Sequence, residues 1–437
     1  MTTSLCFNRN QPVLAALLLA ALALAVCPAT AAEISVIGDG AATEPAAKTA
    51  PAGAQAGTFF DISLPAANSS GAALSTKNVG DDLSLLGGFV GTTNHISLNK
   101  LKLTNTNLSG AIYTKTWVPA GAKTLQLGAG GLVTTGKDFS ILGGNLVLDI
   151  GSTTQPWAVG PGFLMLFSNV IGSGTINLTS GTVNVRNSTN FAGVWSVASG
   201  ATLTAWNSGS LGSSRTNWSD PTGVVRLEGG TLRCNNDKVS YPQPIELGSK
   251  GGTLNTSPTL SSTLTGKIGN QVGVATTSLK VIANANSNST GSGSAMILAG
   301  DLSAHVGPLV LGSASTGLTI GFAPKSKLSF VLGANRVVDG VDTATTALIS
   351  AGGSANVTKV EFNGKFVVDL SQADTTGGNT WKLVDADKLN ESYGASFSLV
   401  AATGGEFKKE GARWVLVDRS QTWSFDPATG VLSLSVL

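Results

Sequence analysis

The sequence predicts an all-β protein that folds as a right-handed parallel β-helix, or β-solenoid, with a C-terminal β-strand cap. A tripeptide of glycine, threonine and an aliphatic residue recurs at residues 174–176, 181–183, 230–232 and 252–254. A glycine turn followed by a β-branched and an aliphatic residue is typical of the start of a short strand. Its repetition indicates a solenoid, in which each unit buries its apolar face against its neighbour. Helix signals are nearly absent after the N-terminal leader.

The composition indicates a folded chain without an electrostatic surface for nucleic acid. The 437 residues include 55 glycines, and 12% of the residues are charged while 42% are hydrophobic. The aliphatic content argues against disorder, because disordered chains lack the apolar surface that offsets the entropy cost of ordering. The formal net charge is only +2, so we expect neither nucleic acid nor an anionic lipid surface as a partner.

The first 31 residues have the features of a signal peptide. Arg9 supplies a positive charge, residues 13–26 are almost entirely apolar, and Ala29 and Ala31 place small residues where a signal peptidase reads them. We predict cleavage after Ala31, with cleavage after Ala32 as the alternative. The apolar run is short for a membrane span of roughly 20 residues. We therefore expect an exported mature chain without an integral membrane span, in the periplasm, at the cell surface or outside the cell.

The rest of the chain divides into three predicted segments. Residues 32–57 are rich in Ala, Pro, Gly and Thr and are predicted to be a flexible linker. Residues 58–354 contain the short strand-like runs and the glycine pairs of the predicted β-helix. Residues 355–437 have longer strands with more Trp and more charge. We interpret this last segment as a cap, because the end of a solenoid exposes apolar surface and unpaired strand edges.

The weak helix signal excludes some architectures and leaves others open. The best candidate for a helix after the leader is the segment 385–391, which is long enough for about two turns. Without crossover helices, a doubly wound α/β fold is excluded, and a β-helix, a β-sandwich and a barrel remain. The Gly-Thr units favour the β-helix, because their spacing fits coils of roughly 20 to 30 residues.

The glycine and aliphatic phrases also resemble a known repeat. Residues 172–178, 190–203 and 207–212 together resemble one autotransporter-associated β-strand repeat, and residues 264–311 resemble a second, looser copy. Residues 125–132 are similar to a phrase found upstream of such repeats. The resemblance implies a large exported bacterial β-helix protein on or beyond the cell surface. The region after residue 355 is too short for the membrane barrel of an autotransporter, so the chain resembles the passenger part alone.

Few residues in the sequence suggest chemistry. Cys234 is the single cysteine outside the predicted signal peptide, so we expect no internal disulfide and interpret it as a small strand residue. His95 and His305 are isolated, and two such residues do not make a zinc site. Asp81 and Asp82 form an adjacent acidic pair, but adjacent strand residues point to opposite faces. We interpret the pair as a solvated turn and predict no catalytic residue, no metal site and no cofactor.

The tryptophans offer a hypothesis for binding. Trp195 shares its phase with Val197 and is expected to pack inward or against the next coil. Trp206 is out of phase with the apolar residues before it, and Trp218 lies in a turn-rich segment. Exposed indoles stack on sugar rings, so Trp206 and Trp218 are candidate glycan contacts. The alternative is that both side chains cover a loop over the solenoid.

Three classes of function remain open from the sequence. The first is an exported structural or adhesive β-solenoid of the bacterial cell surface or extracellular space. The alternatives are a polysaccharide-cleaving β-helix enzyme and a polysaccharide-binding protein without catalysis. The sequence has no phosphate-binding loop, nucleophile elbow or dinucleotide fingerprint, which favours the first class. The expected partners are glycans or cell-surface components, and the oligomeric state is left open.

Overall fold

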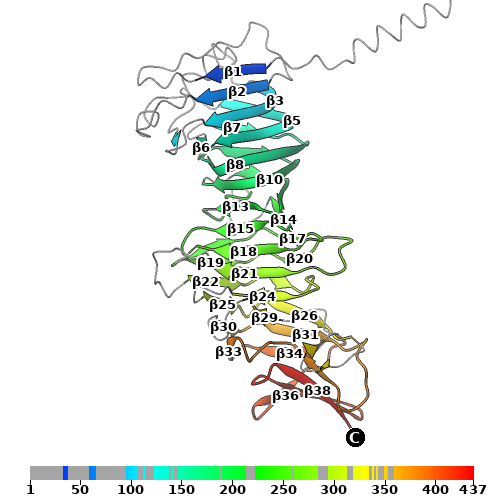
Figure 1. The fold of residues 1–437 in the computed structure, drawn as a ribbon. Coiled ribbons are helices and arrows are strands. Elements are labelled where there is room, and N and C mark those ends of the chain that lie inside the picture. Colours follow the sequence, from blue (N-terminus) through cyan, green and yellow to red (C-terminus); the bar gives the residue numbers. More distant parts are fainter. Residues whose placement is uncertain are drawn as a thin grey trace, which may run out of the picture.

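The described part of the protein is an all-β stack of strands. The computed structural model describes residues 33–37, 59–64, 95–105, 112–113, 123–136, 139–141, 146–186, 189–212, 222–257, 259–283, 294–312, 318–333, 337–338, 341–342, 349–352 and 359–437. These residues form 38 strands and no helix. In Figure 1 the strands lie across the long axis of an elongated molecule and follow one another from one end to the other in sequence order. The prediction of an all-β chain is confirmed.

The N-terminal part of the stack consists of parallel strands of uneven length. β1, β2, β3 and β5 pair successively in parallel, and β5 continues to β7 and β8. β8 pairs with β10, which pairs with both β12 and β13. The strands of this part are β1 (Glu33–Ile37), β2 (Phe59–Leu64), β3 (His95–Asn105), β4 (Ile112–Tyr113), β5 (Lys123–Gly136), β6 (Phe139–Ile141), β7 (Leu146–Asp149), β8 (Thr154–Leu166), β9 (Asn169–Gly172), β10 (Thr175–Val185), β11 (Asn190–Phe191), β12 (Val194–Ala198) and β13 (Ala201–Ala205).

Between β14 and β26, each pairing joins a strand to the strand three places later in the chain. β14 pairs with β17, β15 with β18 and β16 with β19, always in parallel, and the next strands repeat this step. The strands are β14 (Val224–Glu228), β15 (Thr231–Cys234), β16 (Val239–Tyr241), β17 (Ile245–Leu247), β18 (Gly252–Thr256), β19 (Ser261–Leu264), β20 (Ile268–Asn270), β21 (Leu279–Ala283), β22 (Ser294–Leu298), β23 (Asp301–Leu302), β24 (Leu309–Leu311), β25 (Leu318–Phe322) and β26 (Lys327–Val331).

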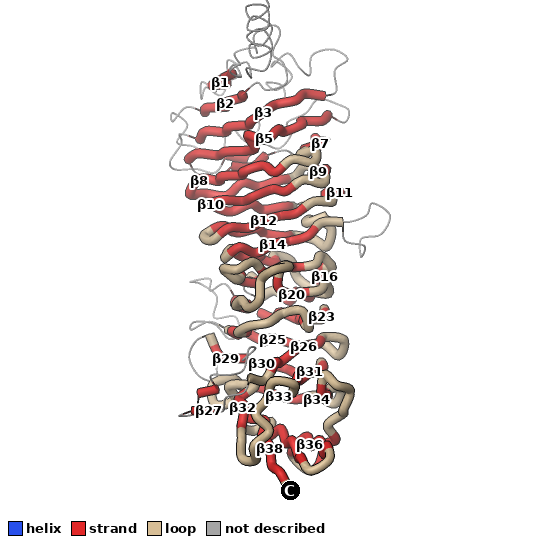
Figure 2. The backbone as a smooth tube through the Cα atoms, turned by 90° about the vertical axis from the view of Figure 1, so that its right-hand side faces the viewer, coloured by secondary structure: helices blue, strands red, loops and turns tan. Residues whose placement is uncertain are grey.

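The parallel pairing continues into the C-terminal part of the chain. β24 pairs with β29, β25 with β30, β30 with β33, β26 with β31, and β31 with β34. These strands are β29 (Ile349–Ala351), β30 (Lys359–Phe362), β31 (Lys365–Asp369), β33 (Asn390–Tyr393) and β34 (Ser398–Ala401). Figure 2, viewed from the side, shows the same stack of strands down to the C-terminus. The long parallel sheets are compatible with a β-solenoid.

The register places residues of one kind above one another. Leu164, Val183, Leu203, Leu232 and Leu254 are aligned through β8, β10, β13, β15 and β18, and all five are buried. Their sequence numbers step by roughly 20 to 30 residues, as the Gly-Thr spacing predicts. Side chains alternate between the two faces of the sheet along each strand, so the residue before each of these aliphatic residues faces the other side.

The threonines of the repeated tripeptide form such an outward column. Thr182, Thr202, Thr231 and Thr253 are aligned in register and are half-buried; we call them the threonine column. The glycine before two of these threonines is required by close packing. A Cβ on Gly230 would lie 2.5 Å from Cγ1 of Val197, and Gly181 has a φ of 72°, which L side chains rarely adopt.

An antiparallel sheet closes the C-terminal end. It runs in the order β32-β38-β37-β36-β35 and packs a buried aromatic group that includes Trp381, Trp414, Trp423 and Phe425. Its strands are β32 (Thr380–Lys382), β35 (Lys408–Glu410), β36 (Arg413–Asp418), β37 (Gln421–Asp426) and β38 (Val431–Val436), and β27 (Val337–Val338) and β28 (Val341–Asp342) form a separate hairpin.

The segment 385–391 differs from its sequence prediction. It forms a single turn, in which the amides of Lys388 and Leu389 both donate to the carbonyl of Asp385, and β33 begins at Asn390. The pairing of β33 with β30 takes up the residues that a second helical turn would need. No helix among the described residues has the length and apolar character to cross a membrane.

Candidate functional sites

Trp206 follows the end of β13 and stacks against a cation. Its backbone amide donates to the carbonyl of Val185 at 3.2 Å, which places Trp206 beside Arg186 in the neighbouring layer of the stack. The guanidinium carbon of Arg186 lies 3.3 Å from the centroid of the Trp206 ring, and the same carbon lies 5.8 Å from the ring of Phe167. One face of the indole is therefore covered by a guanidinium, an arrangement that gains free energy from the ring quadrupole. The indole N–H of Trp206 is buried, and no residue in the described part of the chain accepts a hydrogen bond from it.

The other two tryptophans of the sequence hypothesis have different outcomes. Trp195 packs inward as predicted, with 1% of its surface exposed. Its indole N–H donates to the carbonyl of Leu211 at 3.1 Å, and its ring meets those of Trp157 and Phe191 edge to face. Trp218 lies outside the described residues, as do the predicted cleavage positions Ala31 and Ala32. The glycan contact of Trp206 and Trp218 stays a prediction.

A second outward column lies beside the threonine column. Thr204, Arg233 and Asn255 are aligned through β13, β15 and β18; we call them the arginine column. Their sequence neighbours, Leu203 and Leu232 among them, point into the core. Although the arginine column faces away from that core, Thr204 and Asn255 are 1% and 3% exposed. The side-chain atoms Thr204 Oγ1, Arg233 Nε and Asn255 Oδ1 are all buried and have no hydrogen-bond partner among the described residues.

Cys234 and His305 are buried in environments that suppress their charged forms. Burial raises the pKa of the Cys234 thiol to about 12, so this cysteine is no nucleophile at neutral pH. Burial lowers the pKa of His305 to about 4, which keeps the imidazole neutral at pH 7. Nδ1 of His305 lies 3.1 Å from Oδ1 of Asn270. His95 begins β3, where it pairs in register with Thr124.

Several acidic residues of the described segments have structural roles or ion-pair partners. Oδ1 of Asp149 accepts the amide of Gly151 at 2.8 Å, so this carboxylate closes the turn after β7. Asp81 and Asp82 lie outside the described residues. No group of three or more His, Cys, Asp or Glu side chains in the described part of the chain is arranged to hold a metal ion.

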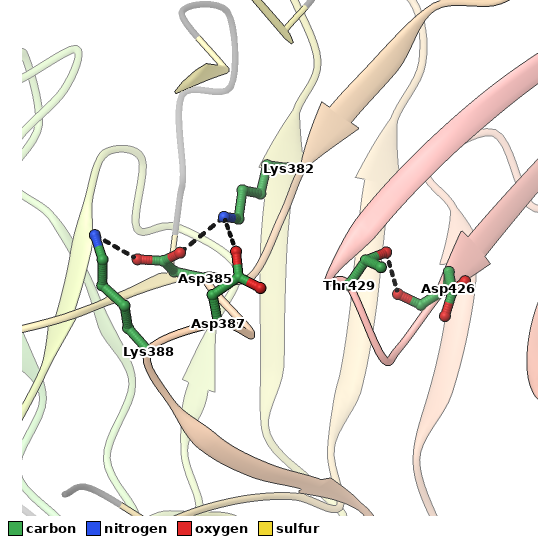
Figure 3. Close-up of polar contacts among 6 residues, drawn as sticks. All are labelled: Lys382, Asp385, Asp387, Lys388, Asp426 and Thr429. Carbon is green, nitrogen blue, oxygen red and sulfur yellow. Dashed lines mark hydrogen bonds and ion pairs between the residues drawn. The ribbon is translucent and has the colours of Figure 1, made fainter. Parts of the chain in front are cut away.

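The densest group of charges lies where the parallel strands meet the antiparallel sheet (Figure 3). Nζ of Lys382 lies 2.8 Å from Asp385 and 3.1 Å from Asp387, and Lys388 lies 3.4 Å from Asp385. Burial raises the pKa of Asp385, but the hydrogen bond and charge of Lys382 outweigh it and leave that pKa below its usual value. The two lysines and two aspartates neutralise one another, so the group lacks the free general base that hydrolysis needs.

The turn beside this group is also shown in Figure 3. The hydroxyl of Thr429 donates to the backbone carbonyl of Asp426 at 3.4 Å, and the amide of Ala428 donates to the Asp426 side chain at 3.0 Å. These contacts form the turn between β37 and β38, where Asp426, Pro427 and Gly430 are residue types that favour turns. The Asp426 carboxylate also forms an ion pair with Arg413 at 3.1 Å, and this pair joins β37 to β36 within the antiparallel sheet.

The arginine column was not predicted from the sequence. Arg233 stands between two core residues of a short strand, which marks it as outward-facing, but its isolation depends on what the fold places around it. Comparisons with protein-family models, with curated proteins and with solved structures find no match to this chain. The assignment of function therefore rests on the residues themselves.

Proposed function

We propose that this protein is a right-handed, three-faced β-solenoid that is exported and has a structural or adhesive role at the bacterial cell surface or in the extracellular space. The observation that carries the proposal is the pairing of each strand with the strand three places later, from β14 to β19 and beyond. Three strands per turn give a coil with three faces. We propose that the coil is right-handed, because crossover connections between parallel strands are right-handed in nearly all proteins.

The outward surface supports a structural or adhesive role. The threonine column presents neutral hydroxyl groups at a spacing of about 4.8 Å, the distance between neighbouring strands. Such a column is uncharged and repeats along the stack, which suits a stiff element that makes many weak contacts. The resemblance to autotransporter-associated repeats and the predicted signal peptide favour export.

A polysaccharide-binding role is the second candidate, and one observation favours it. The arginine column and Trp206 place buried, unpartnered polar atoms on the outward side of the same strands. Polar groups of this kind are normally paired in the folded protein, so these strands are the first place to test for a polar ligand. A polysaccharide-cleaving role has no comparable support, because the charges that converge around Asp385 pair with one another.

Localisation tests the proposal. The full chain would be produced in a bacterial host beside a variant that lacks residues 1–31, and cytoplasmic, periplasmic, surface and medium fractions would be compared. We expect the full chain outside the cytoplasm, with a mature N-terminus at Ala32 or Glu33, and the variant inside. An unprocessed full chain in the cytoplasm would overturn export. Export without any attachment of the purified protein to cells or glycans would leave the structural role and reject the adhesive one.

A further inference from the structure

One sheet of the stack carries lysines on successive strands near its C-terminal end. β23, β26, β31 and β34 pair in parallel and lie one below another in Figure 2. Asp301, Lys327, Lys365 and Ser398 are aligned in register through these strands. The next residue in each strand is a buried core side chain, so the aligned residues face outward.

Lys267 lies at one end of this alignment, near Asp301. Burial raises the pKa of Asp301, but hydrogen bonds from Ser303 lower it below its usual value. The charges of Lys327 and then Lys267 add to this lowering. Both ammonium groups are therefore close enough to act on the Asp301 carboxylate.

At the other end the alignment continues into β35. The amide of Phe407 donates to the carbonyl of Leu399 at 3.0 Å, beside an antiparallel bridge between these two segments. Antiparallel pairing then places Lys408 opposite Ser398, and both face away from the buried Phe407 and Leu399. The outward lysines of this sheet are Lys267, Lys327, Lys365 and Lys408; we call them the lysine column.

The lysine column is open to solvent and is not balanced by acidic residues. Its members are exposed, apart from Lys365, which is half-buried. Asp301 is the acidic residue within the column, and its carboxylate lies 3.8 Å from Nζ of Lys327. Glu406 and Asp369 lie two and four residues from the column along their strands, but neither forms an ion pair with a lysine in the described part of the chain. The column therefore keeps an excess of positive charge.

Lys327 and Lys365 depart from the charge pattern seen earlier in the stack. They stand directly beside each other on β26 and β31, and like charges at such a short distance repel each other. Arg226 and Glu246 have the same relation on β14 and β17, and they form an ion pair at 2.7 Å. Stability alone would favour an acidic residue at position 365, and a lysine there is accounted for if an anionic partner binds.

We propose that the lysine column binds a linear acidic polysaccharide that lies along the stack. Neighbouring strands are about 4.8 Å apart, so ammonium groups on successive strands meet successive carboxylates of an extended polymer. Ser329, Val367 and Ser398 stand beside the lysines and offer hydroxyl and small apolar groups to the sugars. No outward position of β26, β31 or β34 carries an aromatic side chain. Single-stranded nucleic acid is bound largely by aromatic stacking, so a polysaccharide fits this surface better.

This surface deepens the proposed adhesive role and rests on it, because it gives the chemistry of what the protein attaches to. The two proposals nevertheless fail separately. Attachment to cells that is the same for the unmodified protein and for variants of Lys365 would keep the adhesive role and reject the lysine column. Export is measured in cells, whereas polysaccharide binding is measured on the purified protein.

The test is a binding measurement on the purified mature protein at low salt. The probes are polygalacturonate, its methyl ester, a thymidine oligonucleotide and phosphatidylglycerol vesicles, each measured by calorimetry. We expect polygalacturonate to bind and its ester to bind at least about tenfold more weakly, because several exposed ion pairs are lost together. Added salt should weaken the binding of polygalacturonate. Equal binding of acid and ester, no binding of the acid, or tighter binding of the oligonucleotide or the vesicles would overturn the proposal.

Three charge variants locate the site. Lys365→Glu should weaken polygalacturonate binding at least about threefold, because one ion pair is lost and a repulsion is added. Asp301→Asn removes the anion of the column, keeps the side-chain oxygen that accepts the amide of Ser303, and should strengthen binding about twofold. Lys280→Glu is the matched control, because Lys280 is exposed on β21, which pairs with β18 and β24. Equal weakening in this control would assign the effect to net charge and overturn the site.

Thermal unfolding separates a binding role of Lys365 from a structural one. Without polymer, Lys365→Glu is expected to raise the Tm, because the new carboxylate stands beside Lys327 where a like charge stood. Polygalacturonate should raise the Tm of the unmodified protein more than that of Lys365→Glu. A lower Tm of Lys365→Glu without polymer would show that Lys365 already has a structural partner and would overturn the proposal.

Discussion

The parallel stack and the C-terminal antiparallel sheet hold together by different means. In the stack, aligned aliphatic residues such as Leu203, Leu232 and Leu254 repeat one contact from strand to strand. In the C-terminal part, one connected group of rings fills the core. The ring centroid of Phe425 lies 5.8 Å from that of Tyr393 and 6.3 Å from those of Phe366 and Trp414. The stack depends on repetition, whereas the terminal sheet depends on a few large side chains.

The difference follows from what each region must cover. A strand inside the stack has neighbours on both sides, so its backbone groups and apolar face are satisfied by copies of itself. The last parallel strands have a neighbour on one side only, and large aromatic residues bury the remaining apolar surface. β35, at the edge of the terminal sheet, is short and carries Lys408 and Lys409, both exposed. Short charged edges discourage further strand pairing.

The strongest test of this contrast is Phe425→Ala. Phe425 is fully buried at the centre of the aromatic group, and we expect a loss of about 3–5 kcal/mol in the free energy of unfolding, typical of a deleted core aromatic. Urea unfolding followed by tryptophan fluorescence measures it, because Trp381, Trp414 and Trp423 lie in the same region. Thr422→Ala, on the other face of β37, is the control and should change stability little. A small effect of Phe425→Ala would mean that the aromatic group is not the main support of this end.

Gly230→Ala tests the stack. The new methyl group would lie 2.5 Å from Cγ1 of Val197, too close for a normal contact, so neighbouring strands must shift. We expect a loss of about 1–3 kcal/mol, the usual range for overpacking. Gly321→Ala is the matched control, because its Cβ would meet the nearest atom, in Ile297, at 3.6 Å, an ordinary contact. Equal effects at both glycines would show that close packing is not what requires Gly230.

Acidification should distinguish the two regions further. His305 belongs to the stack, and burial lowers its pKa from 6.5 to about 4. Between these values the unfolded chain binds a proton that the folded chain does not. The free energy of unfolding therefore keeps its full value above pH 6.5 and declines as the pH falls from 6.5 toward 4. Below pH 4, His305 causes no further change. The slope for a single group is at most about 1.4 kcal/mol per pH unit.

The effect of His305 is isolated by comparing slopes rather than absolute stabilities. Chemical unfolding of the unmodified protein and of His305→Gln between pH 4 and pH 7 gives two curves, and the variant should lack the decline. Glu391, in β33 beside the terminal sheet, works in the opposite direction. Burial, and then the charges of Asp387 and Asp385, raise its pKa. Acidification protonates the carboxylate and so removes the free-energy cost of burying its charge. Parallel curves for the two proteins would refute the assignment to His305.

The sequence predicted what depends on local pattern. The Gly-Thr-aliphatic units predicted short strands that bury an apolar face, and the phase of Trp195 predicted its burial, because alternation along a strand decides both. The turn at 385–391 was missed, since helix-forming residues there yield to the pairing of β33 with β30. The surroundings of Arg233 were not predictable, because they depend on residues that other strands bring near.

The smallest expected effect concerns an ion pair of the stack. Glu246 and Arg226 pair between β14 and β17 with side chains 37% and 26% exposed. Water screens such a pair, so Glu246→Gln should lower the free energy of unfolding by about 0.2–1 kcal/mol. Glu361→Gln is the control, because Glu361 and its partner Lys359 are 41% and 56% exposed, and its effect should be smaller still. A larger loss at Glu246 would mean that charge pairing, and not only repeated apolar and backbone contact, stabilises the stack.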